Sequence, residues 1–210
     1  MSGLDLQRTF GEIDIYLFDQ LLKGRIRPGD RVLDAGCGSG RNLVYLLNAG
    51  IDVWAVDATP HAVAEARELA ARLAPDKPAD RILQTPIESL PWPEAHFNVV
   101  LSSAVLHFAS NHDQFAAMLL EMWRVLAGGG MLFVRLASSI GLEHRVADRG
   151  DGRYGLPDGT ERYLVDERVL LDWTRRLGGQ LLDPLKTTVV QDQRWMTTWV
   201  VRKSCPLSVT

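Results

Sequence analysis

The fold is decided by one stretch, Val32-Leu33-Asp34-Ala35-Gly36-Cys37-Gly38-Ser39-Gly40-Arg41. Apolar residues stand directly before a glycine cluster, and residues 42–49 have helical spacing, so the stretch predicts a buried parallel strand, a tight loop and a helix. The three glycines let the loop backbone turn sharply and come into contact with a bound ligand, next to the N–H groups of the helix. We therefore expect a ligand-binding loop here.

Two residues of this stretch count against a dinucleotide as the ligand. The dinucleotide fingerprint G-x-G-x-x-G requires glycine at position 41, where this sequence has Arg41. Asp34 lies two residues before the first glycine, where its carboxylate would repel a pyrophosphate seated on the loop. A ligand with a cationic amino or sulfonium group would be attracted instead.

The pattern D-x-G-x-G-x-G after an apolar strand resembles the first motif of the class I S-adenosylmethionine-dependent methyltransferases. Asp57 closes the next apolar run and lies 17 residues beyond Gly40, which is near the distance at which such folds place an acid that accepts the hydroxyl protons of a ribose. The resemblance implies S-adenosylmethionine as cofactor, with Asp34 orienting its ammonium and Asp57 holding its ribose. Residues 40–42 are also similar to small-molecule and tellurite-resistance type methyltransferases, which implies a small acceptor.

The segment from Thr85 to Trp92 resembles the part of these methyltransferases that holds the adenine. It departs from the family pattern at Pro86, which replaces the usual acidic residue. Ile87 can still offer its backbone N–H and pack on the ring, and Glu88 either binds the exocyclic amine or faces solvent. The expected cofactor-binding residues are Asp34, Gly36, Cys37, Gly38, Asp57, Ala58, Ile87, Glu88 and Ser102.

Strand and helix patterns alternate along the chain. The expected strands are 31–35, 52–57, 81–85, 97–104 and 131–137, and the expected helices are 12–23, 42–49, 60–73, 111–127 and 166–177, followed by a hairpin of 181–190 and 195–202. This rhythm predicts an α/β fold, a Rossmann-like doubly wound and mostly parallel seven-stranded sheet with an antiparallel C-terminal hairpin. The helix at 12–23 either covers the cofactor cleft or packs on the sheet edge.

The chain of 210 residues fits a single class I methyltransferase domain, 1–210. Within it, residues 138–163 are rich in glycine and charge and lack a helical period, so we expect a substrate-side flap or small insertion there, the alternative being a solvated loop. Net charge is −3 without a long basic run, so no nucleic acid partner is expected.

The expected location is the cytoplasm. Cys37 and Cys205 are the two cysteines of the chain, which favours a reducing compartment, and Met1 to Gly11 lacks a signal-peptide pattern. No apolar run approaches 20 residues, so no membrane association is expected. A homodimer is one assembly compatible with these features.

The chemistry expected is transfer of a methyl group, by in-line attack, to a small-molecule acceptor. His107, just past the fourth strand, is the candidate general base if the acceptor has a proton to lose, the alternative being an imidazole that shapes the pocket. No residue is assigned to a metal. The residues that could contact an acidic substrate are His144, Arg145, Tyr154 and Arg194, and the sequence does not rank them. Two alternatives stay open: a protein that binds S-adenosylmethionine without catalysis, and a nicotinamide-dependent oxidoreductase.

Overall fold

The computed structural model describes residues 5–142 and 144–205. The ends of the expected 1–210 domain and one residue of the expected flap, Glu143, lie outside the described residues. Within the described ranges, no helix combines the length and the apolar character needed to cross a bilayer.

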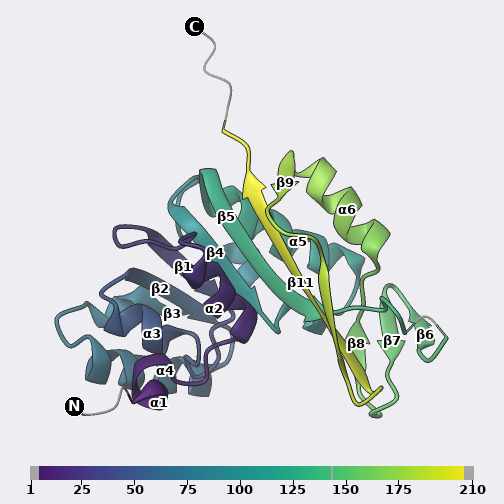
Figure 1. The fold of residues 1–210 in the computed structure, drawn as a ribbon, viewed down its shortest axis with the longest axis horizontal. Helices are drawn as coiled ribbons and strands as arrows, with labels where there is room; N and C mark the ends of the chain where they lie inside the picture. The colour runs from purple at the N-terminus through teal and green to yellow at the C-terminus, as the bar shows by residue number, and fades with distance from the viewer. Residues whose placement is uncertain (1–4, 143, 206–210) are drawn as a thin grey trace, which may run out of the picture.

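A central sheet organises the fold (Figure 1). Its strands follow the order β10 (Lys186–Val190), β11 (Arg194–Lys203), β5 (Leu126–Ala137), β4 (Phe97–Ser103), β1 (Arg31–Ala35), β2 (Asp52–Asp57) and β3 (Ile82–Gln84), and the short β9 (Gly179–Leu181) pairs with β11. The pairs from β5 through β3 are parallel, whereas β11 runs antiparallel to β5 and β10. The predicted doubly wound sheet with a C-terminal antiparallel hairpin is confirmed.

Helices cover both faces of this sheet. They are α1 (Leu6–Phe10), α2 (Ile15–Leu22), α3 (Leu43–Asn48), α4 (Pro60–Leu73), α5 (His112–Val125) and α6 (Glu167–Arg176), with 3₁₀ turns η1 (Ala79–Arg81), η2 (Ile87–Ser89) and η3 (Leu106–Phe108). Side-chain caps begin α5 and α6, because Asn111 and Asp166 accept the N–H groups of Gln114 and Val169.

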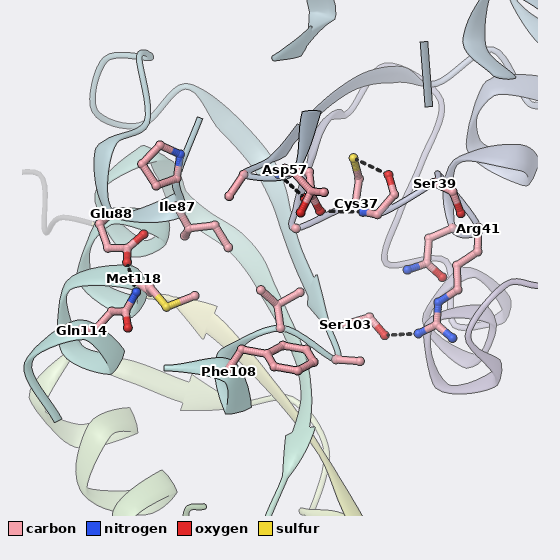
Figure 2. A pocket seen from close by; sticks show the side chains of 18 residues that line it. Cys37, Ser39, Arg41, Asp57, Ile87, Glu88, Ser103, Phe108, Gln114 and Met118 are labelled. Carbon is pink, nitrogen blue, oxygen red and sulfur yellow. Dashed lines mark hydrogen bonds between the residues drawn. The ribbon is translucent and has the colours of Figure 1, made fainter. Parts of the chain in front are cut away.

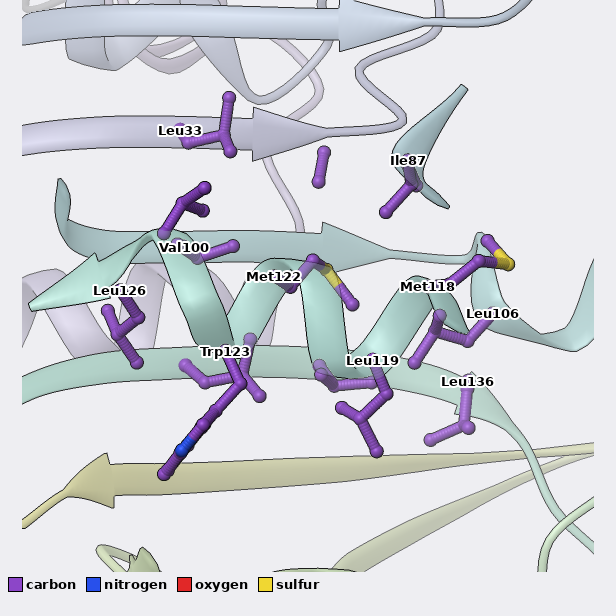
Figure 3. Packing of buried hydrophobic residues seen from close by; sticks show 14 of the residues in the cluster. Leu33, Ile87, Val100, Leu106, Met118, Leu119, Met122, Trp123, Leu126 and Leu136 are labelled. Atoms are coloured by element: carbon purple, nitrogen blue, oxygen red, sulfur yellow. The ribbon is translucent and has the colours of Figure 1, made fainter. Parts of the chain in front are cut away.

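Two apolar clusters fill the layers between helices and sheet. One cluster joins the sheet to α5 and α6, and Figure 3 shows Met118, Met122 and Trp123 of α5 packed over it. The other joins the sheet to α2, α3 and α4. Successive residues of β1 alternate between the clusters, Val32 in the second and Leu33 in the first, as the pleat of a strand requires. The core therefore fixes both faces of the strand that leads into the glycine loop.

The boundary between α5 and β5 differs from the prediction. Strand β5 begins at Leu126, not at Met131, and runs through the glycines that were expected to end α5 and separate it from the strand. The register of its partner β4 shifts between Phe97 and Val99, which absorbs the irregular stretch. The tertiary pairing of the backbone, which the sequence pattern does not encode, overrides the glycine signal.

Residues of the expected flap form a small antiparallel sheet, β6 (Ala147–Gly150), β7 (Arg153–Gly155) and β8 (Glu161–Tyr163). This sheet is fastened to η3 and α5: Arg153 Nη1 donates to the carbonyl of Ala109 at 3.0 Å, and the hydroxyl of Tyr163 lies 2.8 Å from His112 Nδ1. The segment therefore contains regular β structure.

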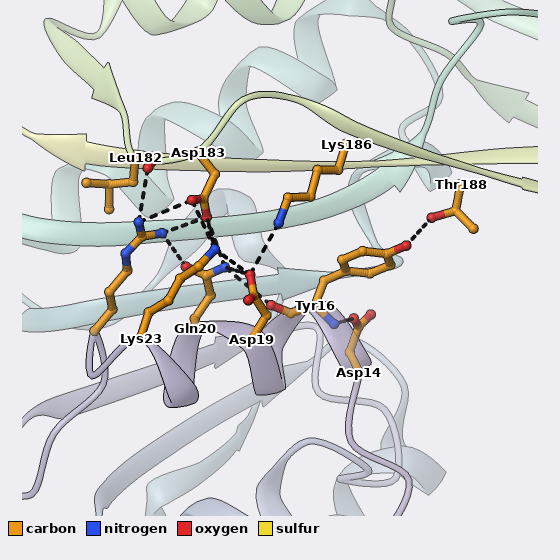
Figure 4. Close-up of polar contacts among 10 residues, drawn as sticks. Asp14, Tyr16, Asp19, Gln20, Lys23, Leu182, Asp183, Lys186 and Thr188 are labelled. Atoms are coloured by element: carbon orange, nitrogen blue, oxygen red, sulfur yellow. Dashed lines mark hydrogen bonds and ion pairs between the residues drawn. The ribbon is translucent and has the colours of Figure 1, made fainter.

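The leading helix α2 packs against the C-terminal edge of the sheet (Figure 4). The carboxylate of Asp183 accepts hydrogen bonds from Gln20, Lys23 and Arg25, and the hydroxyls of Tyr16 and Thr188 are 2.5 Å apart. Burial alone would raise the pKa of Asp183, but the hydrogen bonds from these donors outweigh it and lower the pKa to about 2. This partly buried acid therefore stabilises the folded state when it is ionised.

Replacement of Asp183 by asparagine should lower the free energy of unfolding by about 2 kcal/mol at neutral pH. Because the folded pKa is depressed, the contribution is present above the unfolded pKa and should fade as the pH falls from about 5 to about 2. Urea unfolding of the wild type and the Asp183→Asn variant across this range measures it. The control is Asp192→Asn, at a side chain that is 70% exposed. Equal stabilities at neutral pH would contradict the prediction.

Candidate active site

A pocket of about 540 Å³ lies at the carboxyl ends of β1, β2 and β4, where the winding of the sheet reverses (Figure 2). Its volume falls within the range of small-molecule sites. The walls come from the glycine loop, the end of β2, η2, the segment after β4 and α5. The lining residues are Gly36, Cys37, Gly38, Ser39, Arg41, Asn42, Asp57, Ala58, Thr59, Pro86, Ile87, Glu88, Ser103, Ala104, Val105, Phe108, Gln114 and Met118.

The backbone of the glycine loop requires glycine at position 36. Gly36 has φ +87°, and a Cβ added there would lie 2.4 Å from Cγ2 of Val105. A Cβ added at Gly38 would meet no atom within 4 Å, so the backbone is open to the pocket there. The N–H groups of Gly36 and Cys37 both donate to the carbonyl of Val56 at 2.9 Å, which ties the loop to β2.

Asp57 forms the wall at the end of β2. One carboxylate oxygen accepts the N–H of Gly38 at 2.9 Å and the other accepts the N–H of Thr59 at 2.8 Å. Each carboxylate oxygen has a second lone pair, so Asp57 can still accept two hydroxyl protons from a ligand. The carboxylate thus orients the loop and also faces the pocket.

Asp34 lies in β1, two residues before Gly36, and is fully buried. Both of its carboxylate oxygens lack a hydrogen-bond partner among the described residues. Burial raises its pKa to about 7, although the charge of Arg41 opposes the shift. An unpaired buried carboxylate lowers the free energy of unfolding when it is ionised. A cationic group bound at the loop would reduce this loss.

Seven of the predicted cofactor residues line this pocket: Gly36, Cys37, Gly38, Asp57, Ala58, Ile87 and Glu88. Ser102 does not, because its side chain is fully buried, and its neighbour Ser103 lines the pocket instead. Adjacent residues of a strand point to opposite faces, so Ser103 faces the pocket and Ser102 faces away from it. Asp34 lies behind the loop and is not in the lining. Burial raises the pKa of the Cys37 thiol, which disfavours its reactive thiolate form.

Ile87 and Glu88 lie on the side of the pocket opposite Arg41, with Asp57 between them (Figure 2). Ile87 is buried, and the Glu88 carboxylate accepts a hydrogen bond of 2.6 Å from the side-chain amide of Gln114. Glu88 is therefore held at the pocket wall, where it stays partly exposed.

His107 was expected in the catalytic centre, but it lines a second cavity, of about 360 Å³. The two spaces share Arg41, Ala104 and Phe108 as walls. Burial, and then the charges of Arg162 and Arg135, lower the pKa of His107 to about 4, so the imidazole is neutral at physiological pH.

The position of the His107 proton follows from its hydrogen bond. The Nδ1 atom accepts the N–H of Ala137 at 3.2 Å, which leaves the proton of a neutral imidazole on Nε2. This geometry favours a hydrogen-bond donor over the predicted general base. Of the four residues left open for substrate contacts, Arg194 lines this cavity.

Sequence patterns missed several residues at the boundary of the two spaces. Arg41 Nη2 donates to Ser103 Oγ at 2.9 Å, and Ser103 Oγ donates to Asp14 at 2.8 Å. Ala104 adopts φ +64°, which a non-glycine residue rarely does and which is frequent at functional sites. The one available signal was position: Ser103 ends the buried strand β4 and Ala104 follows it, at the ligand-binding edge of the sheet.

These features define an α/β domain with a ligand site at the switch point of a doubly wound sheet. Residues 33–134 match the family model of the methyltransferase domain. The malonyl-[acyl-carrier protein] O-methyltransferase of Enterobacter lignolyticus is 36% identical over 109 residues, which are 51% of this chain and 39% of that protein. The chain spans less than half of the length of the first curated relatives that it matches.

Solved structures share the fold over most of the chain. The Burkholderia thailandensis 1,6-didemethyltoxoflavin-N1-methyltransferase, solved with its substrate and S-adenosylhomocysteine, aligns with TM-score 0.68 and 22% identity, covering 96% of this chain and 82% of that one. The [4+2]-cyclase SpnF aligns with TM-score 0.69 and 19% identity, covering 90% and 82%. At these identities the likeness shows the fold alone. The chain therefore shares the fold of these proteins, and its central segment is similar to the methyltransferase domain.

Replacing Asp34 by asparagine should stabilise the ligand-free protein by about 2 kcal/mol near pH 8. Because the folded pKa is raised, the folded wild type retains a proton that the unfolded chain loses, so the advantage of the variant should shrink as the pH falls from about 7 towards about 4. Urea unfolding without cofactor measures this difference. A variant no more stable than the wild type at pH 8 would show that the buried carboxylate carries no such cost.

Proposed function

We propose that this protein is an S-adenosylmethionine-dependent methyltransferase that acts on a small-molecule acceptor. The observation that carries the proposal is the unpaired, buried carboxylate of Asp34 behind an open glycine loop, with the pocket-facing acid Asp57 ending the next strand. Opposite charge at this loop favours a cationic ligand and disfavours a pyrophosphate. The family match over residues 33–134 supports the same assignment.

The residues present fit this cofactor. Asp57 would accept the ribose hydroxyl protons, and Ile87 with Glu88 would hold the adenine on the far side of the pocket. The open backbone at Gly38 would contact the methionine part, whose ammonium would be attracted by Asp34. In this arrangement the methionine part lies toward Arg41 and Ser103, the side that adjoins the second cavity.

When bound, the cofactor supplies a methyl group on a positive sulfur: the acceptor atom forms a bond to the methyl carbon as the carbon–sulfur bond breaks, and its electron pair goes to the sulfur. The chain then contributes mainly position. Holding two reactants at near-attack distance is worth up to roughly 7 to 11 kcal/mol of the barrier. Ala104 and Phe108 line both spaces and would set the distance between cofactor and acceptor.

Further features of the protein belong to the same proposal. The chain acts as one domain, 1–210, with residues 138–163 as a substrate-side flap, and works in the cytoplasm without nucleic acid. The homodimer and the similarity of residues 40–42 to tellurite-resistance methyltransferases stay predictions. A protein that binds the cofactor without transferring its methyl group is the second candidate, because a protein described as a [4+2]-cyclase shares this fold.

S-adenosylhomocysteine should raise the melting temperature of the protein, and NAD should not. A ligand at 100 times its dissociation constant stabilises by about 2.7 kcal/mol, which thermal unfolding resolves. Methyl transfer is then measured with labelled S-adenosylmethionine and a panel of small thiols, amines, phenols and carboxylates. Stabilisation by NAD alone would favour the oxidoreductase, and cofactor binding without any labelled product would favour the non-catalytic candidate.

The Asp57→Ala variant should bind S-adenosylhomocysteine more weakly by about 1 to 3 kcal/mol, the scale for lost hydrogen bonds to a charged group. Isothermal titration calorimetry measures the affinity. Glu65→Ala is the control, since this acid of α4 is 47% exposed and is not among the residues that line the pocket. Equal affinities of the wild type and Asp57→Ala would remove this acid from the ribose site.

A further inference from the structure

The second cavity carries an excess of positive charge. Four of its lining residues are Arg41, Arg135, Arg162 and Arg194, and none of the described residues that line it is acidic. They come from the glycine loop, β5, β8 and the start of β11, so four distant parts of the chain converge there. One guanidinium group can donate two parallel hydrogen bonds to the oxygens of a carboxylate or a phosphate. A cluster of four arginines therefore attracts anions.

Part of this charge is balanced by one buried acid. The Asp14 carboxylate lies 3.6 Å from Arg41 and 3.4 Å from Arg135. Asp14 is the N-cap of α2, is 5% exposed, and accepts a hydrogen bond from the hydroxyl of Ser103. Asp14 therefore holds two of the arginines at the boundary with the cofactor pocket, and the Nε atom of Arg135 is still buried without an acceptor among the described residues.

The other two arginines have no such partner. Within residues 5–142 and 144–205, Arg162 and Arg194 form no ion pair with a carboxylate. Asp158 is an acid that their charges influence, and its carboxylate is engaged by the N–H and hydroxyl of Thr160. Arg162 Nη1 donates to the carbonyl of Glu161 at 2.7 Å, so its other guanidinium N–H groups and those of Arg194 stay available to a ligand.

An aromatic ring lies beside these charges. Phe108 is 59% exposed, lines both spaces, and has the guanidinium carbon of Arg162 4.9 Å from its ring centroid. Next to it, His107 presents a neutral imidazole whose proton is on Nε2, a further donor and no acceptor. The cavity therefore combines an apolar surface with side-chain donors, which suits an acceptor that has a ring or chain and an oxyanion.

We infer that this cavity is the acceptor site and that it binds the acceptor through an anionic oxygen group held by Arg162 and Arg194. The inference rests on the proposed function, since the shared walls Arg41, Ala104 and Phe108 join the cavity to the cofactor pocket. A carboxylate and a phosphate offer the same oxygen chemistry to guanidinium groups. Both belong to the inferred class, and a neutral isostere does not.

The test uses benzoate and phenyl phosphate as anionic probes and benzamide as the neutral control, titrated calorimetrically into the full chain saturated with S-adenosylhomocysteine. At least one anion should bind more tightly than benzamide, and the better of the two tells carboxylate from phosphate. Arg162→Gln and Arg194→Gln should each weaken its binding by roughly tenfold. Arg162→Lys, which keeps the charge, should recover part of it.

Two controls show whether a loss of anion binding is specific to these arginines. Affinity for S-adenosylhomocysteine should be unchanged in the arginine variants, and Arg168→Gln, at a side chain of α6 that is 88% exposed, should leave anion binding intact. Benzamide binding as tightly as both anions, or full anion affinity in an Arg162→Gln/Arg194→Gln double variant, would overturn the inference. Failure of S-adenosylhomocysteine to bind the wild type would instead refute the proposed function, and with it the role of the cavity as an acceptor site.

Discussion

The hydrogen bond from the Gly38 N–H to Asp57 is the interaction on which the rest of the site depends. It joins the loop after β1 to the end of β2, while the close approach of Gly36 to Val105 joins the same loop to the segment after β4. Three parallel strands thus deliver their carboxyl ends to one place, and the helices behind them bury both faces of the sheet. The pocket follows from this convergence, because each strand end contributes one wall.

Stability and ligand binding make opposite demands at Asp34. A carboxylate with no partner among the described residues, fully buried in β1, is unfavourable in the folded protein, and an apolar residue would serve the core better. This unpaired carboxylate behind the glycine loop is the feature that supports the proposed cationic ligand. Asp183 is the contrasting case: its donors are built into the fold, so its ionised form stabilises the protein without any ligand.

Local patterns predicted what local physics determines. The apolar run before Gly36, the cap at Asp166 and the proline at the start of α4 indicated the strand and the helix starts. Seven residues that line the first pocket were predicted from the glycine loop, the acid Asp57 and the resemblance of residues 85–92 to a family segment. The sequence did not predict that Ser103 and not Ser102 faces the pocket, that β5 begins at Leu126, or that a second cavity exists. Each of these features depends on how distant segments of the chain meet. Arg135, Arg162 and Arg194 are surface-type residues in sequence, and tertiary structure alone brings them together.

The family match ends at residue 134, and this boundary divides the two spaces unequally. Every residue lining the cofactor pocket lies within 33–134, whereas the second cavity takes Arg135, Arg162 and Arg194 from beyond it. Asp14, which holds two of the cavity's arginines, lies before the matched segment, in the cap of α2. Two chains that share residues 33–134 can therefore differ in the second cavity by exchanging only α2 and the segments after residue 134, while every residue that lines the first pocket stays the same.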